Sequence, residues 1–249
     1  ITTAGNNSSV IATDRGGGTV TVDKGTYKTT GGDCAVIYST GTISVTDITG
    51  SSSQGEISVI EGSNSITMNN SEISSSSSSR ANLILQSGSG DATGYDAKVT
   101  VNGGTLTSTS TSAPFLEVTT NTTGTFTCNS ATITVGSGIL MAVDYNTRWS
   151  TKGATGNLVL NGSGYTYTGN VTCDSYSTAT VTIGSGATWK GAMDNANTGK
   201  STSVTVNGTW TLSANSYVDK LVVASGATVN KAGFTLTASS TSNSGTIND

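Results

Sequence analysis

A short pattern of apolar, polar and apolar residues recurs along the chain, each time followed by small turn residues and another apolar or aromatic residue. It first appears as Val20-Thr21-Val22 followed by Tyr27 and last as Leu221-Val222-Val223 followed by Val229. The third residues of the nine copies are Val22, Val45, Met68, Val101, Cys128, Leu160, Ile183, Val206 and Val223. They are 23 positions apart in four of the eight intervals, and longer intervals hold insertions such as 88–96 and 148–156. Repeats of this length predict the coils of a β-solenoid, since a propeller blade requires about 40 residues or more.

Alternation within each copy places its first and third residues on one face, so that stacked copies form a continuous apolar column. A single coil cannot bury that face, whereas a stack of coils can. The right-handed preference of parallel crossovers sets the expected direction of winding. We therefore expect an all-β chain, a right-handed single-stranded parallel β-helix of about nine coils, with residues 1–249 in one domain or one segment of a longer surface protein or filament.

The residue that follows the third position is asparagine in many copies. These residues are Asn69, Asn102, Asn129, Asn161 and Asn207. Asparagine tolerates the left-handed conformation of a tight turn, and stacked amides can form a hydrogen-bonded ladder along the axis. We interpret this set as a structural ladder and not as a ligand site.

Two stretches carry a resemblance to known proteins. Residues 35–40 and 59–66, AVIYST and VIEGSNSI, resemble the adhesin-like β-helix proteins of microbial cell surfaces. Residues 208–218 resemble the repeats of autotransporter passenger domains. The resemblance implies an exported β-helix that acts as an extracellular adhesion or surface module, and it names no ligand or activity.

Composition narrows the function classes. Charged residues make up 10% of the chain, against roughly 25% in an average globular protein, and the net charge is −4. No basic run suggests nucleic acid, and no apolar run approaches the roughly 18 residues of a membrane span. There is no histidine and no Asp-Asp pair, and we expect neither a metal nor a cofactor. The start at Ile1, without a methionine or signal peptide, suggests a mature or excised piece of a secreted protein.

The three cysteines, Cys34, Cys128 and Cys173, are too few and too widely spaced for a disulfide framework or a zinc site. Free cysteine is among the most buried residue types. We therefore expect buried thiols, with Cys128 in the inward column between Val101 and Leu160.

An acidic row is the strongest candidate for a ligand site. Alignment of the strand before each repeat predicts one inward column and one outward column. The inward column is Ile37, Ile60, Leu85, Leu116 and Val143, and the outward column is Tyr38, Glu61, Gln86, Glu117 and Asp144. Coils about 4.8 Å apart would bring Glu117 and Asp144 close together, near the approximately 5 to 5.5 Å carboxyl spacing of a retaining glycosidase. Tyr145, Arg148 and Trp149 follow in sequence and could face a sugar. The carboxyls of Glu117 and Asp144 could also share a proton or a cation. Alternatively, the whole row could be a solvated polar strand face without a ligand.

Threonine and serine dominate the outward positions of the repeated strand. The pairs are Thr19 and Thr21, Thr42 and Ser44, Ser65 and Thr67, Thr125 and Thr127, Thr180 and Thr182, and Ser203 and Thr205. A flat, uncharged threonine array resembles the face of ice-binding solenoids. Threonine is also a favoured strand residue, which explains the pattern without any ligand.

The two ends, 1–15 and 238–249, carry no amphipathic helix that would cap the stack. Uncapped coils present unpaired backbone groups to further strands. We therefore expect an end to meet further coils, a neighbouring domain or an identical subunit, unless short tails fold across it. The favoured function is a rigid extracellular rod for adhesion to a glycan or cell surface, with carbohydrate binding or cleavage and ice binding as alternatives.

Overall fold

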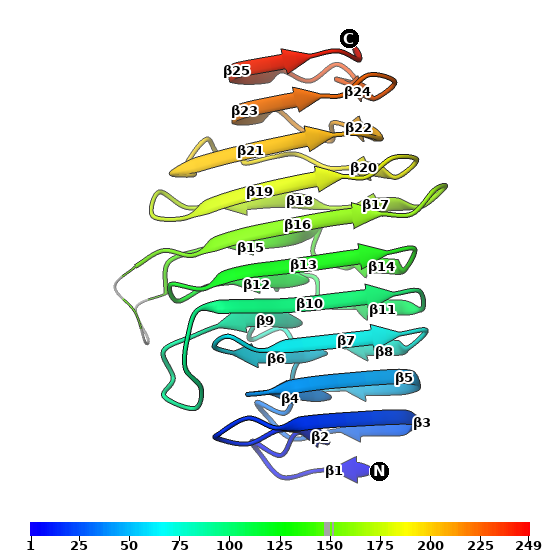
Figure 1. Cartoon of the computed structure of the whole chain (residues 1–249), viewed down its shortest axis with the longest axis vertical. Helices are drawn as coiled ribbons and strands as arrows, with labels where there is room; N and C mark the ends of the chain where they lie inside the picture. Colours follow the sequence, from blue (N-terminus) through cyan, green and yellow to red (C-terminus); the bar gives the residue numbers. More distant parts are fainter. Residues whose placement is uncertain (147–149, 151) are drawn as a thin grey trace.

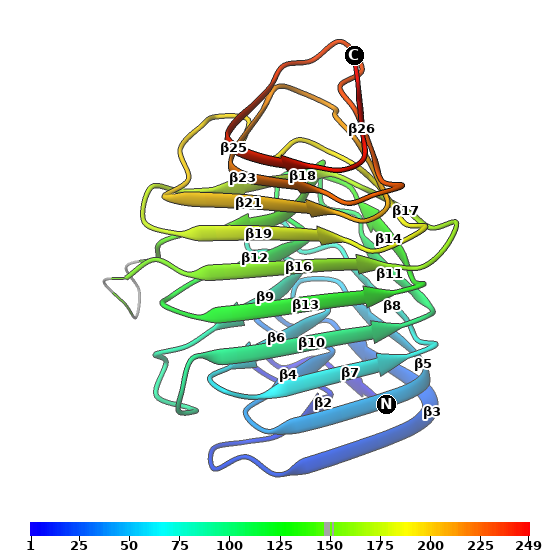
Figure 2. The same ribbon diagram turned by 45° about the horizontal axis from the view of Figure 1, so that its top comes forward.

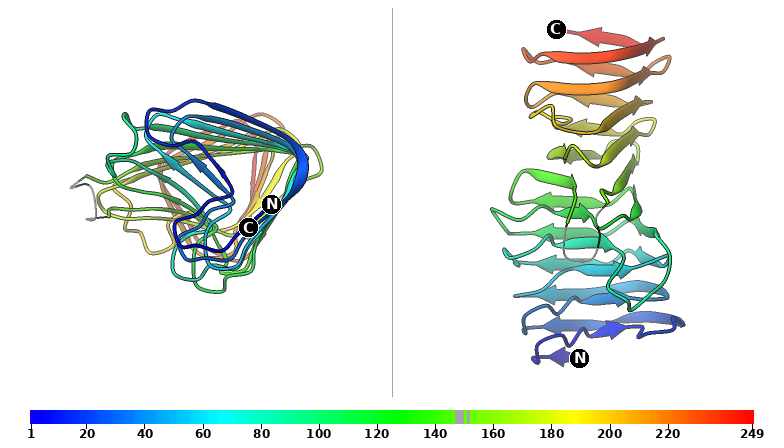
Figure 3. Two further views of the ribbon diagram at one scale, coloured as in Figure 1. Left: turned by 90° about the horizontal axis from the view of Figure 1, so that it is seen from below. Right: turned by 90° about the vertical axis from the view of Figure 1, so that its left-hand side faces the viewer.

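The chain forms a β-solenoid of about ten turns, which confirms the predicted fold class (Figure 1). The computed structural model describes residues 1–146, 150 and 152–249, and these contain no helix. Every strand pairing recorded among them is parallel. The turns stack along one axis, with the N-terminal coil at one end and the C-terminal coil at the other (Figures 2 and 3). No helix that could cross a membrane is found in this part of the chain.

Ten strands of the 14-stranded sheet, one from each turn, lie side by side and are here called the front sheet. Its strands are β3 (Thr19–Thr29), β5 (Thr42–Ser52), β7 (Ser65–Asn69), β10 (Asp96–Asn102), β13 (Thr123–Asn129), β16 (Thr155–Asn161), β19 (Thr178–Ile183), β21 (Ser201–Val206), β23 (Ser216–Val223) and β25 (Leu236–Asn243). A short first strand, β1 (Thr2–Thr3), pairs with the end of β3. The predicted apolar column is confirmed, because the third residues of all nine repeats are direct register partners from Val22 to Val223.

The sequence pattern missed the tenth strand of the front sheet. In β25, Thr241 and Asn243 pair with Leu221 and Val223 of β23. Thr241 and Asn243 put polar residues at the first and third positions of the repeat, so this stretch carries no apolar, polar, apolar signal. Backbone hydrogen bonding to the preceding coil does not require that signal, and the strand forms without it.

A second sheet, here called the back sheet, lies across the core from the front sheet. It consists of β2 (Ile11–Ala12), β4 (Ile37–Ser39), β6 (Ser58–Glu61), β9 (Leu83–Gln86), β12 (Leu116–Val118), β15 (Ile139–Val143) and β18 (Asn170–Cys173). The solenoid's third side is formed by the ends of β3 and β5 and by shorter strands. These are β8 (Glu72–Ser75), β11 (Thr105–Ser108), β14 (Thr132–Val135), β17 (Thr166–Thr168), β20 (Thr188–Lys190), β22 (Thr209–Thr211), β24 (Thr228–Asn230) and β26 (Thr246–Asn248).

Two of the apolar or aromatic residues that follow the repeat in sequence, Tyr27 and Tyr165, do not share the register of their counterparts on the third side. Tyr27 aligns with Gly50, not with Ile48, and the buried tyrosine after the sixth repeat is Tyr167, not Tyr165. Tyr165 remains partly exposed at a turn. The turns differ in length by two residues between coils, and such a shift preserves the strand alternation that the sequence reading relied on.

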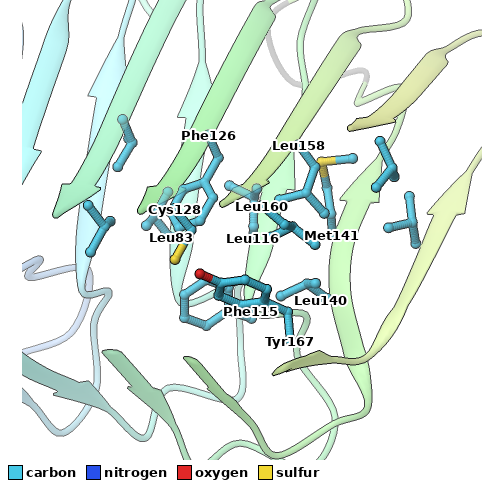
Figure 4. Packing of buried hydrophobic residues seen from close by; sticks show 14 of the residues in the cluster. Leu83, Phe115, Leu116, Phe126, Cys128, Leu140, Met141, Leu158, Leu160 and Tyr167 are labelled. Atoms are coloured by element: carbon cyan, nitrogen blue, oxygen red, sulfur yellow. The ribbon is translucent and has the colours of Figure 1, made fainter. Parts of the chain in front are cut away.

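The core is one continuous apolar cluster along the axis. Figure 4 shows its middle, where Phe115 from the back sheet and Phe126 from the front sheet meet edge to face with ring centroids 5.9 Å apart. Toward the C-terminal end, Trp189 and Trp210 stack in neighbouring coils. Since each coil contributes only a few side chains, the stability of each depends on its neighbours.

Candidate functional site

The back sheet corrects the predicted acidic row. Ile37 pairs with Ser58 and not with Ile60, so the strands are offset by two residues from the predicted alignment. The proposed inward column mixes two registers, because Leu116 pairs with Leu83 and Met141. The outward residues also form two columns, one running Tyr38, Val59, Ile84, Glu117 and Ala142, and the other containing the pair Glu61 and Gln86. The prediction matched apolar residues, and it therefore passed over Ser58, the polar residue that stands opposite Ile37 at an inward position.

Glu117 and Asp144 nevertheless interact across adjacent strands. Glu117 pairs in register with Ala142, and Asp144 lies two residues further along, on the same face. Burial, and then the negative charge of Asp144, raises the pKa of Glu117 to about 7. Burial also raises the pKa of Asp144, and the charge of Asp174 acts in the same direction.

One oxygen of this pair lacks a donor. Oδ1 of Asp144 is buried and accepts no hydrogen bond from any described residue. A proton on Glu117 would supply the donor and remove the repulsion between two carboxylates. The arrangement therefore favours one proton held between Glu117 and Asp144 near neutral pH. Chemically, it combines one acid and one base on a solvent-facing strand surface.

Tyr145 lies beside this pair as part of an aromatic pair with Tyr176. Their ring centroids are 4.8 Å apart, and Asp174 accepts hydrogen bonds from the backbone N–H groups of both, at 2.6 Å for Tyr145 and 3.0 Å for Tyr176. One carboxylate thus fixes two tyrosines on adjacent coils. Tyr176 was not singled out from the sequence, because the predicted columns ended at Val143 and Asp144 and did not include the coil of Tyr176. The predicted ligand residues Arg148 and Trp149 lie outside the described residues.

Glu61 lies on the back sheet below this pair, and its carboxylate is committed to local contacts. It is 3% exposed and accepts hydrogen bonds from Gln86 Nε2 at 2.5 Å and Ser89 Oγ at 2.8 Å. Arg80 donates to Gln86 Oε1 at 3.2 Å and forms an ion pair of 3.4 Å with buried Glu56. The sequence analysis missed Arg80, although it is the only basic residue between Lys28 and Lys98.

The insertion at 87–95 folds down over the outer face of the back sheet and forms a cleft there. Its Asp91 accepts hydrogen bonds from Arg15 Nε at 2.7 Å and from the Tyr38 hydroxyl at 3.2 Å. Figure 1 shows this loop descending from β9 toward the N-terminal coils before β10 begins. Two adjoining hollows of about 560 and 190 Å³ lie between this loop, the segment 7–14 and the sheet. The hollows share Asn7, Ser9, Asp33, Tyr38 and Asp91.

Four of the five expected ladder residues are joined by hydrogen bonds. Asn102 donates to Asn69 at 2.8 Å, Asn129 to Asn102 at 2.9 Å, and Asn161 to Asn129 at 2.9 Å. Asn207 is separated from them by Gly184, which has no side chain to continue the chain of amides.

The ladder residues do not themselves adopt the left-handed conformation. That conformation falls on the residue after each of the four bonded asparagines, as at Asn70 (φ 46°), Gly103 (φ 70°) and Ser130 (φ 53°). The turn reading was therefore wrong by one position. The ladder asparagines end their strands in extended backbone, which aligns their side chains with those of the coils above and below.

We expect Asn129→Ala to lower the free energy of unfolding by about 1 kcal/mol or more, because it removes the donor to Asn102 Oδ1 and the acceptor of Asn161 Nδ2. Urea denaturation followed by circular dichroism measures the change. The matched control is Asn207→Ala, an exposed residue outside the ladder, with an expected change within about 0.5 kcal/mol. Equal effects at the two positions would contradict a stabilising ladder.

The three cysteines are free and buried in the structure. Cys128 lies in the inward column between Val101 and Leu160, and burial raises the pKa of its thiol. Figure 4 shows it in the core near Tyr167. We expect a maleimide to label Cys128 only slowly in the native protein and rapidly in denaturant, as mass spectrometry of tryptic peptides would show. Rapid native labelling, or recovery of Cys128 in a disulfide, would contradict this placement.

The front sheet presents its threonines and serines in register. Thr125 and Thr180 are separated by Asn157, and Thr127 and Thr182 by Val159. Lys98 and Lys220 also occupy this face. Among the described residues of the expected array, one side-chain hydrogen bond joins two members, Thr180 and Ser203 at 3.1 Å. The face is therefore a regular hydroxyl surface interrupted at several coils.

Comparison with known proteins leaves the family open. No protein-family model, no curated protein and no solved structure matches the chain.

Proposed function

We propose that the chain is a rigid extracellular module that serves adhesion, a β-helical rod whose side faces meet other surfaces. The observation that carries the proposal is the uninterrupted register of the front sheet over ten coils. At about 4.8 Å per step, these strands form a body about 43 Å long. Its continuous core and axial hydrogen bonding suit a spacer or display element exported to the cell surface, in keeping with the resemblance to adhesin-like proteins.

Adhesion is tested by coupling the chain to fluorescent beads and measuring their retention on epithelial cells, on mucin and on microbial cell walls. Retention above that of beads carrying an unrelated β-helix of similar charge is the expected result. Retention no greater than this control on every surface would contradict an adhesive role. In that case, a rod-shaped particle in electron microscopy would support a role as a spacer without adhesion.

Carbohydrate binding is a second candidate, favoured by the fixed pair Tyr145 and Tyr176 beside two carboxyls. Aromatic rings offer large, rigid contact surfaces, and the carboxyls of Asp144 and Glu117 can accept or donate hydrogen bonds to hydroxyls. A glycan array on the purified chain is the first test. For any glycan retained, Tyr176→Ala and the double variant Glu117→Gln with Asp144→Asn should weaken binding. The control Tyr95→Ala, an exposed tyrosine on another coil, should leave binding unchanged. Hydrolysis of a retained glycan would show catalysis.

Ice binding is the proposal that the hydroxyl array of the front sheet favours. Regularly spaced hydroxyls and methyls can order water in a lattice-like layer. Thermal hysteresis and inhibition of ice recrystallisation measure this activity directly. Thr127→Lys on the front sheet should abolish an observed activity, whereas Thr107→Lys on the third side should not. The absence of both effects in the unsubstituted chain would eliminate the proposal.

End-to-end association is a further proposal for partners. The outer edge of β25 pairs with no other described strand, and it leaves a row of backbone donors and acceptors for a second copy or a neighbouring domain. Light scattering over a wide concentration range is the measurement. Growth of linear particles would support stacking, and a monomer at every concentration would contradict self-association.

A further inference from the structure

The cleft beneath the insertion at 87–95 has an apolar floor on the solvent side of the back sheet. Ala35, Val59, Ala81 and Ile84 form a small cluster apart from the main core, and Tyr38 packs against it. Ala35 and Val59 line the smaller hollow directly. Apolar side chains on the outer face of a strand usually mark a covered or a binding surface. Here the insertion covers one side and leaves a cleft open beside it.

The walls of the cleft are unusually acidic for a chain with so few charges. The carboxylates that line its two hollows are Asp14, Asp33, Glu56, Glu61 and Asp91. Two guanidinium groups oppose them, Arg80 at the base and Arg15 at the rim. Glu56 is paired with Arg80, and Asp91 with Arg15. Asp33 lies 3.9 Å from Arg80 and stays 63% exposed. Asp14 is exposed, and its carboxylate accepts only the backbone N–H of Arg15 among the described contacts.

The negative electrostatic potential of these carboxylates acts on Tyr38 at the floor of the cleft. Burial raises the pKa of the Tyr38 hydroxyl, and the charges of Glu61, Asp91 and Asp14 raise it further. Three carboxylates from three separate segments therefore act on one side chain at the centre of the cleft. Low-dielectric walls focus such a potential and raise the local concentration of cations.

Size and preorganisation match a small ligand. The larger hollow, about 560 Å³, falls within the range of roughly 300–1,000 Å³ that is usual for ligand pockets. Its loop wall is held by contacts to three different parts of the chain, from Asp91 to Arg15 and Tyr38 and from Ser89 to Glu61. A pocket with an apolar floor and a few convergent polar groups is the usual form of a binding site.

We propose that this cleft binds an alkylammonium group, with the apolar stem on Ala35, Val59 and the Tyr38 ring and the charged end between Asp14 and Asp33. The assignment goes beyond the proposed adhesive role, because it names a ligand chemistry and a place. A lysine side chain of a partner protein and a free aliphatic diamine share this chemistry. Both carry a flexible methylene stem and a compact, strongly hydrated charge with three donors.

The first experiment is calorimetric titration of the purified chain with cadaverine and, in parallel, with pentanediol, which has the same stem without charge. Cadaverine should bind and pentanediol should not. Asp14→Asn with Asp33→Asn should weaken cadaverine about tenfold or more, equivalent to about 1.4 kcal/mol. Both residues are exposed, so the fold should persist, and circular dichroism checks this.

The matched control is Asp23→Asn with Asp219→Asn, which removes the same charge from the front-sheet strands. If the control binds cadaverine with unchanged affinity, the effect of the first double variant is specific to the cleft. Equal weakening in both double variants would instead show a diffuse attraction to net charge and would overturn the proposal. Methyl resonances of Val59 should shift on titration and provide the location independently. Absence of cadaverine binding, or equal binding of pentanediol, would also overturn the proposal.

Titration with tetralysine separates the two sources of the ligand. Tighter binding of tetralysine than of cadaverine, lost in Asp14→Asn with Asp33→Asn, supports a lysine of a partner protein. Tighter binding of cadaverine, lost in the same variant, supports a free diamine. Tetralysine binding that survives the double substitution while cadaverine does not bind would refute the cleft as an ammonium site.

Discussion

Replacement of Trp189 by alanine is expected to lower the free energy of unfolding by about 3–5 kcal/mol, the usual cost of deleting a large buried aromatic side chain. Trp189 and Trp210 are completely buried, and their rings stack with centroids 5.2 Å apart and planes 9° from parallel. The indole of Trp189 also donates to the Gly169 carbonyl at 2.9 Å. The C-terminal coils hold few other large side chains, so the cavity would open between coils that depend on each other.

Urea denaturation monitored by circular dichroism, with hydrogen exchange in β19 to β22, measures this loss. Trp189→Phe is the partial control, because it keeps a smaller stacking ring and removes the N–H donor and part of the ring volume, with an expected cost of about 1–3 kcal/mol. Tyr95→Ala is the surface control and should change stability by no more than about 0.5 kcal/mol. A Trp189→Ala protein within 1 kcal/mol of the unsubstituted chain would mean that the stack contributes little.

Replacement of Glu117 by glutamine is expected to stabilise the chain above neutral pH by roughly 1–3 kcal/mol. Burial, and then the charge of Asp144, raises the pKa of Glu117 to about 7 in the folded chain, from 4.5 when it is free. The charge of Arg80 opposes this shift, and the charge of Glu56 adds to it. Glutamine occupies the same space and can donate a hydrogen bond to Asp144 at every pH.

The sign follows from proton binding. The folded state holds a proton on Glu117 that the unfolded chain has released, so folding stability falls as pH rises from about 4.5 to about 7 and then levels off. Asp144 contributes in the same direction, because burial, and then the charge of Asp174, raises its pKa. Urea denaturation at pH values across this window should show a slope in the unsubstituted chain and a smaller slope in Glu117→Gln. The exposed Glu72→Gln is the matched control, for which the slope should stay unchanged. An identical slope in Glu117→Gln and the unsubstituted chain would refute the shared proton.

The amino-acid sequence by itself determined the front sheet. Alternation of Val22, Val45 and their counterparts with outward threonines left one register that buries the apolar face, and a one-residue slip would expose it. The same local rule identified the buried position of Cys128 and the alignment of the amides from Asn69 to Asn161. These features depend on residues close together within one repeat, and they repeat often enough to be read directly.

Tertiary structure alone decided the outer face of the back sheet. There, Ser58 stands opposite Ile37 at an inward position, and Val59 faces outward, where it belongs to a small apolar cluster with Ala35, Ala81 and Ile84 apart from the main core. Arg15 and Asp91 meet although they are 76 residues apart, and no periodicity in the sequence records that contact. Burial by distant segments, which sets the register, the raised pKa of Glu117 and the cleft, is a property of the folded chain and is not written in any single repeat.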